Sequence, residues 1–195
     1  MRAKSFATLI FLFVPFCFTS TITTCEAGAN GEPSNLGQVH MDISCSPKVS
    51  QTFDTGLALL HNFWYSRALF QFHQVIRADP DCAIAYWGAA MTYNHPYSDP
   101  PTEADEHEAW TLVQQGSQAR NKSPREQMYL DAVGALFFNS GAGTKSDRDK
   151  AYMNAMASVY AKYPDDETKL FYALAILNTL EEGGDGPRGS NLRPI

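Results

Sequence analysis

Apolar and small residues recur every three or four positions between residues 49 and 93, which predicts three helices there. They are expected at residues 49–63, 65–78 and 82–93. The third segment is apolar on nearly every side, so we expect it to lie in the centre of the fold. Pro80 separates the second helix from the third, because proline cannot continue a helix.

Capping signals predict four more helices in the second half of the chain. Thr102 with Asp105 three positions later is a favourable helix start, and this helix should run to about residue 120. Ser123, Pro124 and Glu126 have the spacing of a capping box with proline in the first turn. Two further helices are expected at about residues 146–163 and 165–180. Seven helices without a convincing strand predict an all-α fold.

The helical pattern repeats along the chain. When Pro164 is set equal to Pro80, Tyr86-Trp87 aligns with Leu170-Phe171, and small or aliphatic residues follow in both copies. Self-similar pairs of helices are typical of a helical solenoid. Residues 94–101, rich in proline, interrupt the pattern between the copies, so the repeats are degenerate.

These residues resemble the tetratricopeptide repeat family, whose unit is a helix-turn-helix with small residues, an aromatic and a terminal proline at fixed places. The resemblance implies a short right-handed solenoid over residues 49–182. It also implies which residues pack the repeats together: Gly56, Ala68, Phe72, Pro80, Ala90 and Pro164.

In that family the first helix of each pair lines an inner concave groove. The resemblance therefore implies a groove that binds a peptide, a protein segment or a flat hydrophobic small molecule. The candidate binding residues are Phe53, Leu57, His61, Trp87, Met91, Asn94 and His95.

Two of these candidates are histidines at the same place in adjacent repeats, so His61 and His95 are expected to stack. Together with Asp99 they could bind a metal, since imidazole and carboxylate suit zinc or iron. No motif guarantees that geometry, and the favoured interpretation is that both histidines make hydrogen bonds across the repeat seam or near helix ends. The sequence thus predicts no metal site and no cofactor.

The N-terminus has the plan of a secretory signal peptide. Arg2 and Lys4 precede an apolar run that is shorter than a membrane span needs, and small residues follow it. A membrane anchor is the competing interpretation. We expect a signal peptide at residues 1–29, an irregular lead-in at 30–48, the repeat domain at 49–182 and a disordered Gly/Pro-rich tail at 183–195. The protein is then secreted or held in the secretory pathway, with no membrane span after cleavage.

Two cysteines remain after signal cleavage, and an oxidising compartment favours a disulfide between Cys45 and Cys82. Such a bridge would connect the lead-in to the turn before the third helix. The alternative is a free Cys82 packed as a small apolar residue. Asn121 begins the glycosylation sequon Asn-Lys-Ser, although Pro124 directly after it disfavours use.

Charge and motif content narrow the function classes. The net charge is −6, and the basic residues are scattered among carboxylates, so nucleic acid is not an expected partner. No nucleophile elbow, phosphate loop or dinucleotide motif occurs, and no catalytic residues are predicted.

Three functional hypotheses follow. The favoured one is a secreted, non-enzymatic scaffold that binds a peptide or protein segment in a concave helical groove. The second is an accessory protein or enzyme of a small-molecule pathway, for instance of secondary metabolism, with a histidine-containing pocket. The third is a truncated remnant, which the abrupt Gly/Pro-rich end of the sequence suggests.

Overall fold

The described part of the computed structural model covers residues 36–96, 101–137 and 143–181, all within the unit Asn35–Ile195. This part is helical, with one isolated backbone bridge between Cys82 and Asn121 as its β-type pairing. Its elements in chain order are η1 (Pro47–Val49), α1 (Ser50–His61), α2 (Tyr65–Ala78), α3 (Ala83–Met91), α4 (Glu103–Gln118), α5 (Pro124–Phe137), α6 (Lys145–Lys162) and α7 (Asp166–Glu181). The predicted all-α class is confirmed.

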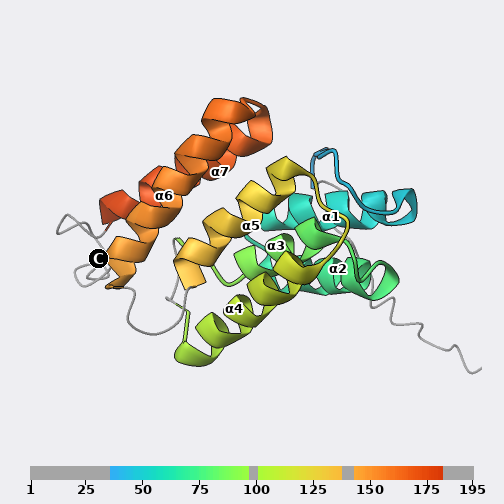
Figure 1. Ribbon diagram of the computed structural model, residues 1–195, viewed down its shortest axis with the longest axis horizontal. Helices are drawn as coiled ribbons and strands as arrows, with labels where there is room; N and C mark the ends of the chain where they lie inside the picture. The colour runs from blue at the N-terminus through green and yellow to red at the C-terminus, as the bar shows by residue number, and fades with distance from the viewer. Residues whose placement is uncertain (1–35, 97–100, 138–142, 182–195) are drawn as a thin grey trace, which may run out of the picture. The chain divides into compact units, whose positions relative to one another are not determined.

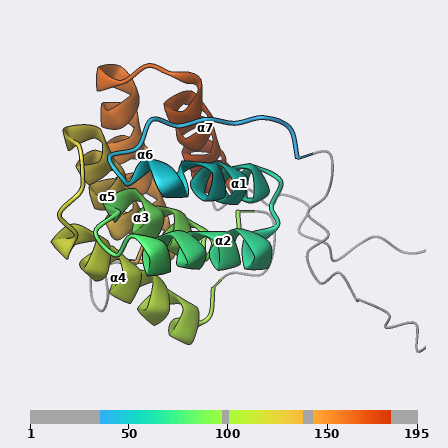
Figure 2. The ribbon, with the colours of Figure 1, turned by 90° about the vertical axis from the view of Figure 1, so that its right-hand side faces the viewer.

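Neighbouring helices pack against each other in chain order (Figure 1). Each helix from α1 to α6 contacts the next helix along the chain, and α3 also contacts both α1 and α5. Figure 2 shows α1 and α2 side by side, with α3 next to them. Helix α3 is therefore surrounded by other helices, and every one of its nine residues is buried, as its all-round apolar sequence predicts.

The helix starts follow the predicted capping residues. Thr102 and Asp105 form a reciprocal capping box at the start of α4. Glu126 donates its backbone N–H to the Ser123 hydroxyl over 3.2 Å, and its carboxylate accepts the backbone N–H of Ser123. A further capping box, formed by Thr144 with the residue three positions later, starts α6 one residue earlier than predicted. The other boundaries agree with the sequence to within about two residues, which is the usual uncertainty of helix ends.

The core of the first three helices is organised around Phe72 of α2. Its ring is fully buried and meets Phe53 of α1 edge to face, with centroids 5.5 Å apart. Gly56 of α1 and Gly88 of α3 both face this ring, and neither has room for a larger side chain without displacing it. Phe72 thus joins three helices, which explains why small residues occur opposite it in the sequence.

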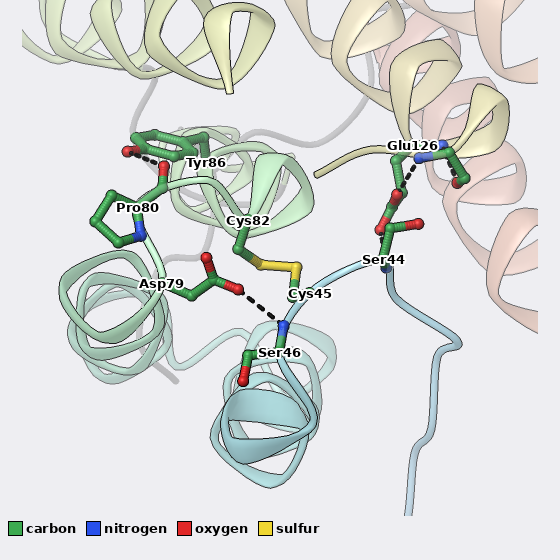
Figure 3. The surroundings of a disulfide bond; sticks show 9 residues. Ser44, Cys45, Ser46, Asp79, Pro80, Cys82, Tyr86 and Glu126 are labelled. Carbon is green, nitrogen blue, oxygen red and sulfur yellow. Dashed lines mark hydrogen bonds between the residues drawn. A yellow bond between two sulfur atoms is a disulfide. The ribbon is translucent and has the colours of Figure 1, made fainter. Parts of the chain in front are cut away.

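The segment before α1 is fixed to the helices by a disulfide (Figure 3). Cys45 and Cys82 are bonded, with their Cα atoms 4.9 Å apart, so the predicted pair is confirmed. On one side of the bridge, Ser46 donates its backbone N–H to Asp79 over 2.8 Å. On the other side, Ser44 donates its backbone N–H to Glu126 over 2.7 Å. The predicted lead-in is irregular over its described residues until η1 begins at position 47.

Several sequence predictions concern parts of the chain outside the described residues. These are the signal peptide at residues 1–29, the tail at 183–195 and Asp99. Asn121 is exposed in the connection between α4 and α5. Its backbone N–H donates to the carbonyl of Asp81 over 2.9 Å, and its own carbonyl accepts the N–H of Ala83 over 3.2 Å.

Candidate functional site

The aromatic and aliphatic groove candidates lie inside the helical core. Phe53, Leu57 and Trp87 have no exposed surface, and Met91 is nearly as buried. Trp87 meets the ring of Tyr129 edge-on at 4.9 Å. These four candidates therefore offer little surface to a ligand in this structure.

The two histidines have different partners instead of stacking on each other. His61 lies 2.7 Å from a carboxylate oxygen of Glu167 on α7, and its ring packs on Phe171 with centroids 5.1 Å apart. His95 donates from Nε2 to the backbone carbonyl of Thr92 over 2.8 Å, and its ring lies 4.2 Å from that of Tyr65. His61 thus joins α1 to α7, whereas His95 follows the end of α3.

Asn94 and Met91 border a narrow crevice between α1, α3 and α7. His61, Phe63, Tyr65 and Phe171 also line this crevice. Its free volume is only about 20 Å³, so it has room for no more than about one water molecule. Asn94 accepts a hydrogen bond from Asn178 of α7 over 3.4 Å. The predicted groove residues His61 and Asn94, which line this crevice, therefore form hydrogen bonds to side chains of α7.

A larger open cavity lies beside the crevice, and we call it the aromatic cavity. Its volume is about 510 Å³, within the range of ligand sites. It lies between the turn from α1 to α2, the end of α3 and the first turns of α4. The side chains important for its chemistry are Phe63, Trp64, Tyr65, Arg67, Tyr93, His95 and Asp105.

Two of these aromatic side chains are strongly exposed. Phe63 is 47% exposed and Trp64 is 43% exposed, although both are among the residues with the most apolar surface to bury. They are adjacent in the sequence and lie on the turn between α1 and α2. Exposed aromatics grouped at a concave site are characteristic of binding surfaces.

The backbone of Phe63 has an unusual conformation that explains this exposure. Its φ angle is +58°, in the left-handed region that bulky residues rarely adopt. The N–H of Phe63 donates to the carbonyl of Leu60 over 3.0 Å, and that of Trp64 donates to Leu59 over 2.9 Å. This is the Schellman motif that ends many helices, with phenylalanine in the place usually taken by glycine. Strained residues of this kind are concentrated at functional sites.

Charged side chains lie among these rings. The guanidinium carbon of Arg67 lies 4.9 Å from the centre of the Trp64 ring, a cation–π contact. Hydrogen bonds from the side chain and backbone of Thr102 hold the pKa of Asp105 below its usual value. Burial raises the pKa of Tyr93, and the carboxylates of Glu108 and Asp105 raise it further. The cavity is therefore aromatic, with a carboxylate on its α4 side.

His95 of this cavity was among the predicted groove residues, whereas the exposed rings of Phe63 and Trp64 were not. The signal was present, because Phe63, Trp64 and Tyr65 are consecutive aromatics at the place where one helix ends and the next begins. Connections lie on the surface, so a run of aromatics there indicates a binding surface more than a core. The groove candidates were the residues that the repeat resemblance places on the inner surface, and these did not include Phe63, Trp64 or Tyr65.

No group of three or more histidine, cysteine, aspartate or glutamate side chains within the described ranges could hold a metal ion. None of the described helices is both long enough and apolar enough to cross a membrane. Comparison with protein-family models, curated proteins and solved structures gives no match for this chain.

Proposed function

We propose that this protein is a secreted, non-enzymatic binding module of tetratricopeptide-like helical repeats, and that it binds a peptide or protein segment at the aromatic cavity. The succession of helices supports the repeat architecture, since each helix packs on the next and α3 packs on both α1 and α5. The disulfide is compatible with an oxidising compartment. The proposed site is centred on the turn between α1 and α2, next to His95 and close to His61.

The observation that carries this proposal is the exposed, left-handed Phe63 at the edge of the aromatic cavity. A glycine at this position would end the helix with less backbone strain, and burying the ring would remove apolar surface from water. Phenylalanine therefore costs stability here without contributing fully to the core. Contact with a bound segment would use its exposed surface, as aromatic anchors do at protein interfaces.

A peptide-binding experiment tests the proposal. The full chain, secreted from a eukaryotic host so that the disulfide forms, is used to select from a displayed library of random peptides. Selected peptides are then titrated against the wild type, Phe63→Gly and Phe70→Ala. Phe70 is 55% exposed on α2 and is a matched control, because it is an exposed phenylalanine that does not line the cavity.

We expect Phe63→Gly to weaken peptide binding by about tenfold or more, as loss of an aromatic anchor does. Its unfolding free energy should stay within about 1 kcal/mol of the wild type, because relief of the left-handed backbone offsets the lost contacts. Phe70→Ala should bind like the wild type. Failure to select any peptide, or equal losses in both variants, would contradict the proposal.

A further inference from the structure

We propose that the segment bound in the aromatic cavity inserts a lysine or arginine side chain between the aromatic rings and Asp105. This inference rests on the proposed function and adds the chemistry of the bound side chain.

The rings favour a cation over a purely apolar group. Trp64, Tyr65 and Tyr93 line one cavity together with Phe63. The face of an aromatic ring carries negative charge density, so an ammonium or guanidinium group near it is attracted, most strongly to tryptophan. A lysine or arginine side chain also has a long apolar stem, which would contact Phe63 while its charged end reaches the other rings.

The protein already makes this kind of contact within the cavity. The guanidinium carbon of Arg67 lies 4.9 Å from the centre of the Trp64 ring, at the distance typical of cation–π pairs. Arg67 is itself an exposed side chain. This contact shows that the Trp64 ring binds a guanidinium, and a ligand cation would have to displace Arg67 or approach another part of the ring.

A carboxylate lies in position to pair with the cation. Asp105 lines the cavity, and the hydrogen bonds from the Thr102 N–H (2.9 Å) and the Thr102 hydroxyl (2.7 Å) both go to its Oδ2 atom. Both of these described hydrogen bonds leave Oδ1 to accept a bond from a ligand ammonium or guanidinium, while His95 of the same cavity is close enough to lower the pKa of Asp105 when charged. Glu108 lies one turn further along α4 and is close enough to Tyr93 to raise the pKa of its hydroxyl.

The net negative charge of the whole chain also favours a basic ligand. With 21 acidic and 15 basic residues, the protein attracts basic segments over a distance and repels acidic ones. The opposite possibility is that Arg67 binds a carboxylate of the ligand. The two possibilities predict effects of opposite sign when the charge of Arg67 is removed.

The first measurement compares two small probes that differ in charge. Nα-acetyl-lysine methylamide and its uncharged analogue from norleucine are titrated into the full chain, and NMR follows the indole N–H signal of Trp64. We expect the lysine compound to bind at least about two- to fivefold more tightly, the usual size of an exposed cation–π or ion-pair contribution. Equal or tighter binding of the norleucine compound, or no response of Trp64 to either, would overturn the inference.

Single substitutions test whether the preference for the lysine compound arises in the cavity. Asp105→Asn should reduce lysine binding about two- to fivefold. Asp147→Asn is the matched control, because Asp147 has the same role in the Thr144 capping box of α6 and does not line the cavity. This control should bind lysine like the wild type. Arg67→Gln should tighten lysine binding by a similar factor, whereas weaker binding together with a preference for an acidic probe would show that the cavity takes carboxylates.

The peptide library separates this inference from the proposed function. Enrichment of lysine or arginine among peptides that need Phe63 supports both. Peptides that need Phe63 but show no preference for basic residues would leave the proposed function standing and overturn the inference. If no peptide binds, the proposed function fails, and with it the inference that a segment delivers the cation.

Discussion

Phe72 illustrates how single residues set the distance between helices in this protein. Its ring is fully buried between α1 and α3, and a Cβ atom built on Gly88 would lie only 2.4 Å from it. The corresponding distance at Gly56 is 3.0 Å. Atoms this close repel strongly, so Gly88 is required by packing, although glycine in a helix interior otherwise costs stability.

Replacing Gly88 by alanine should destabilise the protein by about 1–3 kcal/mol, because the new methyl group overpacks the core around Phe72. Urea denaturation followed by circular dichroism measures the change. The matched control is Gly134→Ala in α5, where a Cβ atom would meet Val113 at an ordinary 3.4 Å. That variant should be neutral or gain up to about 1 kcal/mol from better helix propensity. Equal effects at both glycines would contradict this account of the packing.

Phe63 is the reverse of Gly88, which is a glycine that packing requires. There a large side chain occupies a backbone position that favours glycine, and the ring is left about half exposed. Packing explains Gly88, whereas Phe63 contacts the ring of Tyr65, with centroids 6.2 Å apart, and still leaves about half of its surface exposed. The proposed peptide binding gives this residue a physical reason, and the Phe63→Gly experiment tests it.

At the scale of elements, the helices follow local rules, while the segment before α1 depends on distant contacts. The starts of α4 and α6 are set by threonine and aspartate side chains within the same turn. The lead-in has no such local support. It is held by the Cys45–Cys82 bond and by backbone hydrogen bonds to Asp79 and Glu126 on other elements. Its position is therefore expected to be more sensitive to reduction than the helices themselves.

Breaking the disulfide should lower the unfolding free energy by up to about 4 kcal/mol, the loop-closure contribution expected for cysteines 37 positions apart. The double variant Cys45→Ala/Cys82→Ala and the reduced wild type should show nearly the same loss in urea denaturation, with helix content retained. A double variant as stable as the oxidised wild type would show that the hydrogen bonds of Ser44 and Ser46 fix the segment without the bridge.

At the scale of the whole helical unit, His61 connects its first and last described α-helices. The distance of 2.7 Å to Glu167 spans 106 positions of sequence, and the two side chains are only 16% and 13% exposed. The His61 ring also packs on Phe171. Partly buried pairs of this kind are less screened by solvent than surface pairs, so this contact should couple α1 to α7 energetically.

A double-mutant cycle on His61→Ala and Glu167→Ala should give a coupling energy of about 0.5–3 kcal/mol. The comparison is a cycle on Asp166 and Lys169, an exposed ion pair within α7 whose atoms lie 3.1 Å apart. That local pair should show no more than about 0.5 kcal/mol. Similar coupling in the two cycles would mean that the contact between α1 and α7 adds nothing beyond an ordinary surface pair.

The structure places some of the predicted groove residues beside the cavity and others inside the core. His95 was singled out and lines the aromatic cavity, and His61 and Met91 line the adjacent crevice. Trp87 was expected in a groove, but it is enclosed by Tyr129 and Phe171 from helices far along the chain. Helical periodicity assigns a residue to a face of its helix, but it does not say whether another helix covers that face.

The sequence by itself determined the all-α class and the helix boundaries to within about two residues, because these depend on local spacing and capping. It left open whether Cys82 is bonded to Cys45 or stays a free apolar residue, and the structure decided for the disulfide. Tertiary structure alone decided which apolar residues are buried, where each histidine finds its partner and where an open cavity remains. These properties depend on contacts between residues distant in sequence, such as His61 with Glu167 and Trp87 with Phe171. The aromatic cavity exists because Thr92, Tyr93 and His95 after α3, together with Asp105 of α4, lie beside the turn that displays Phe63 and Trp64.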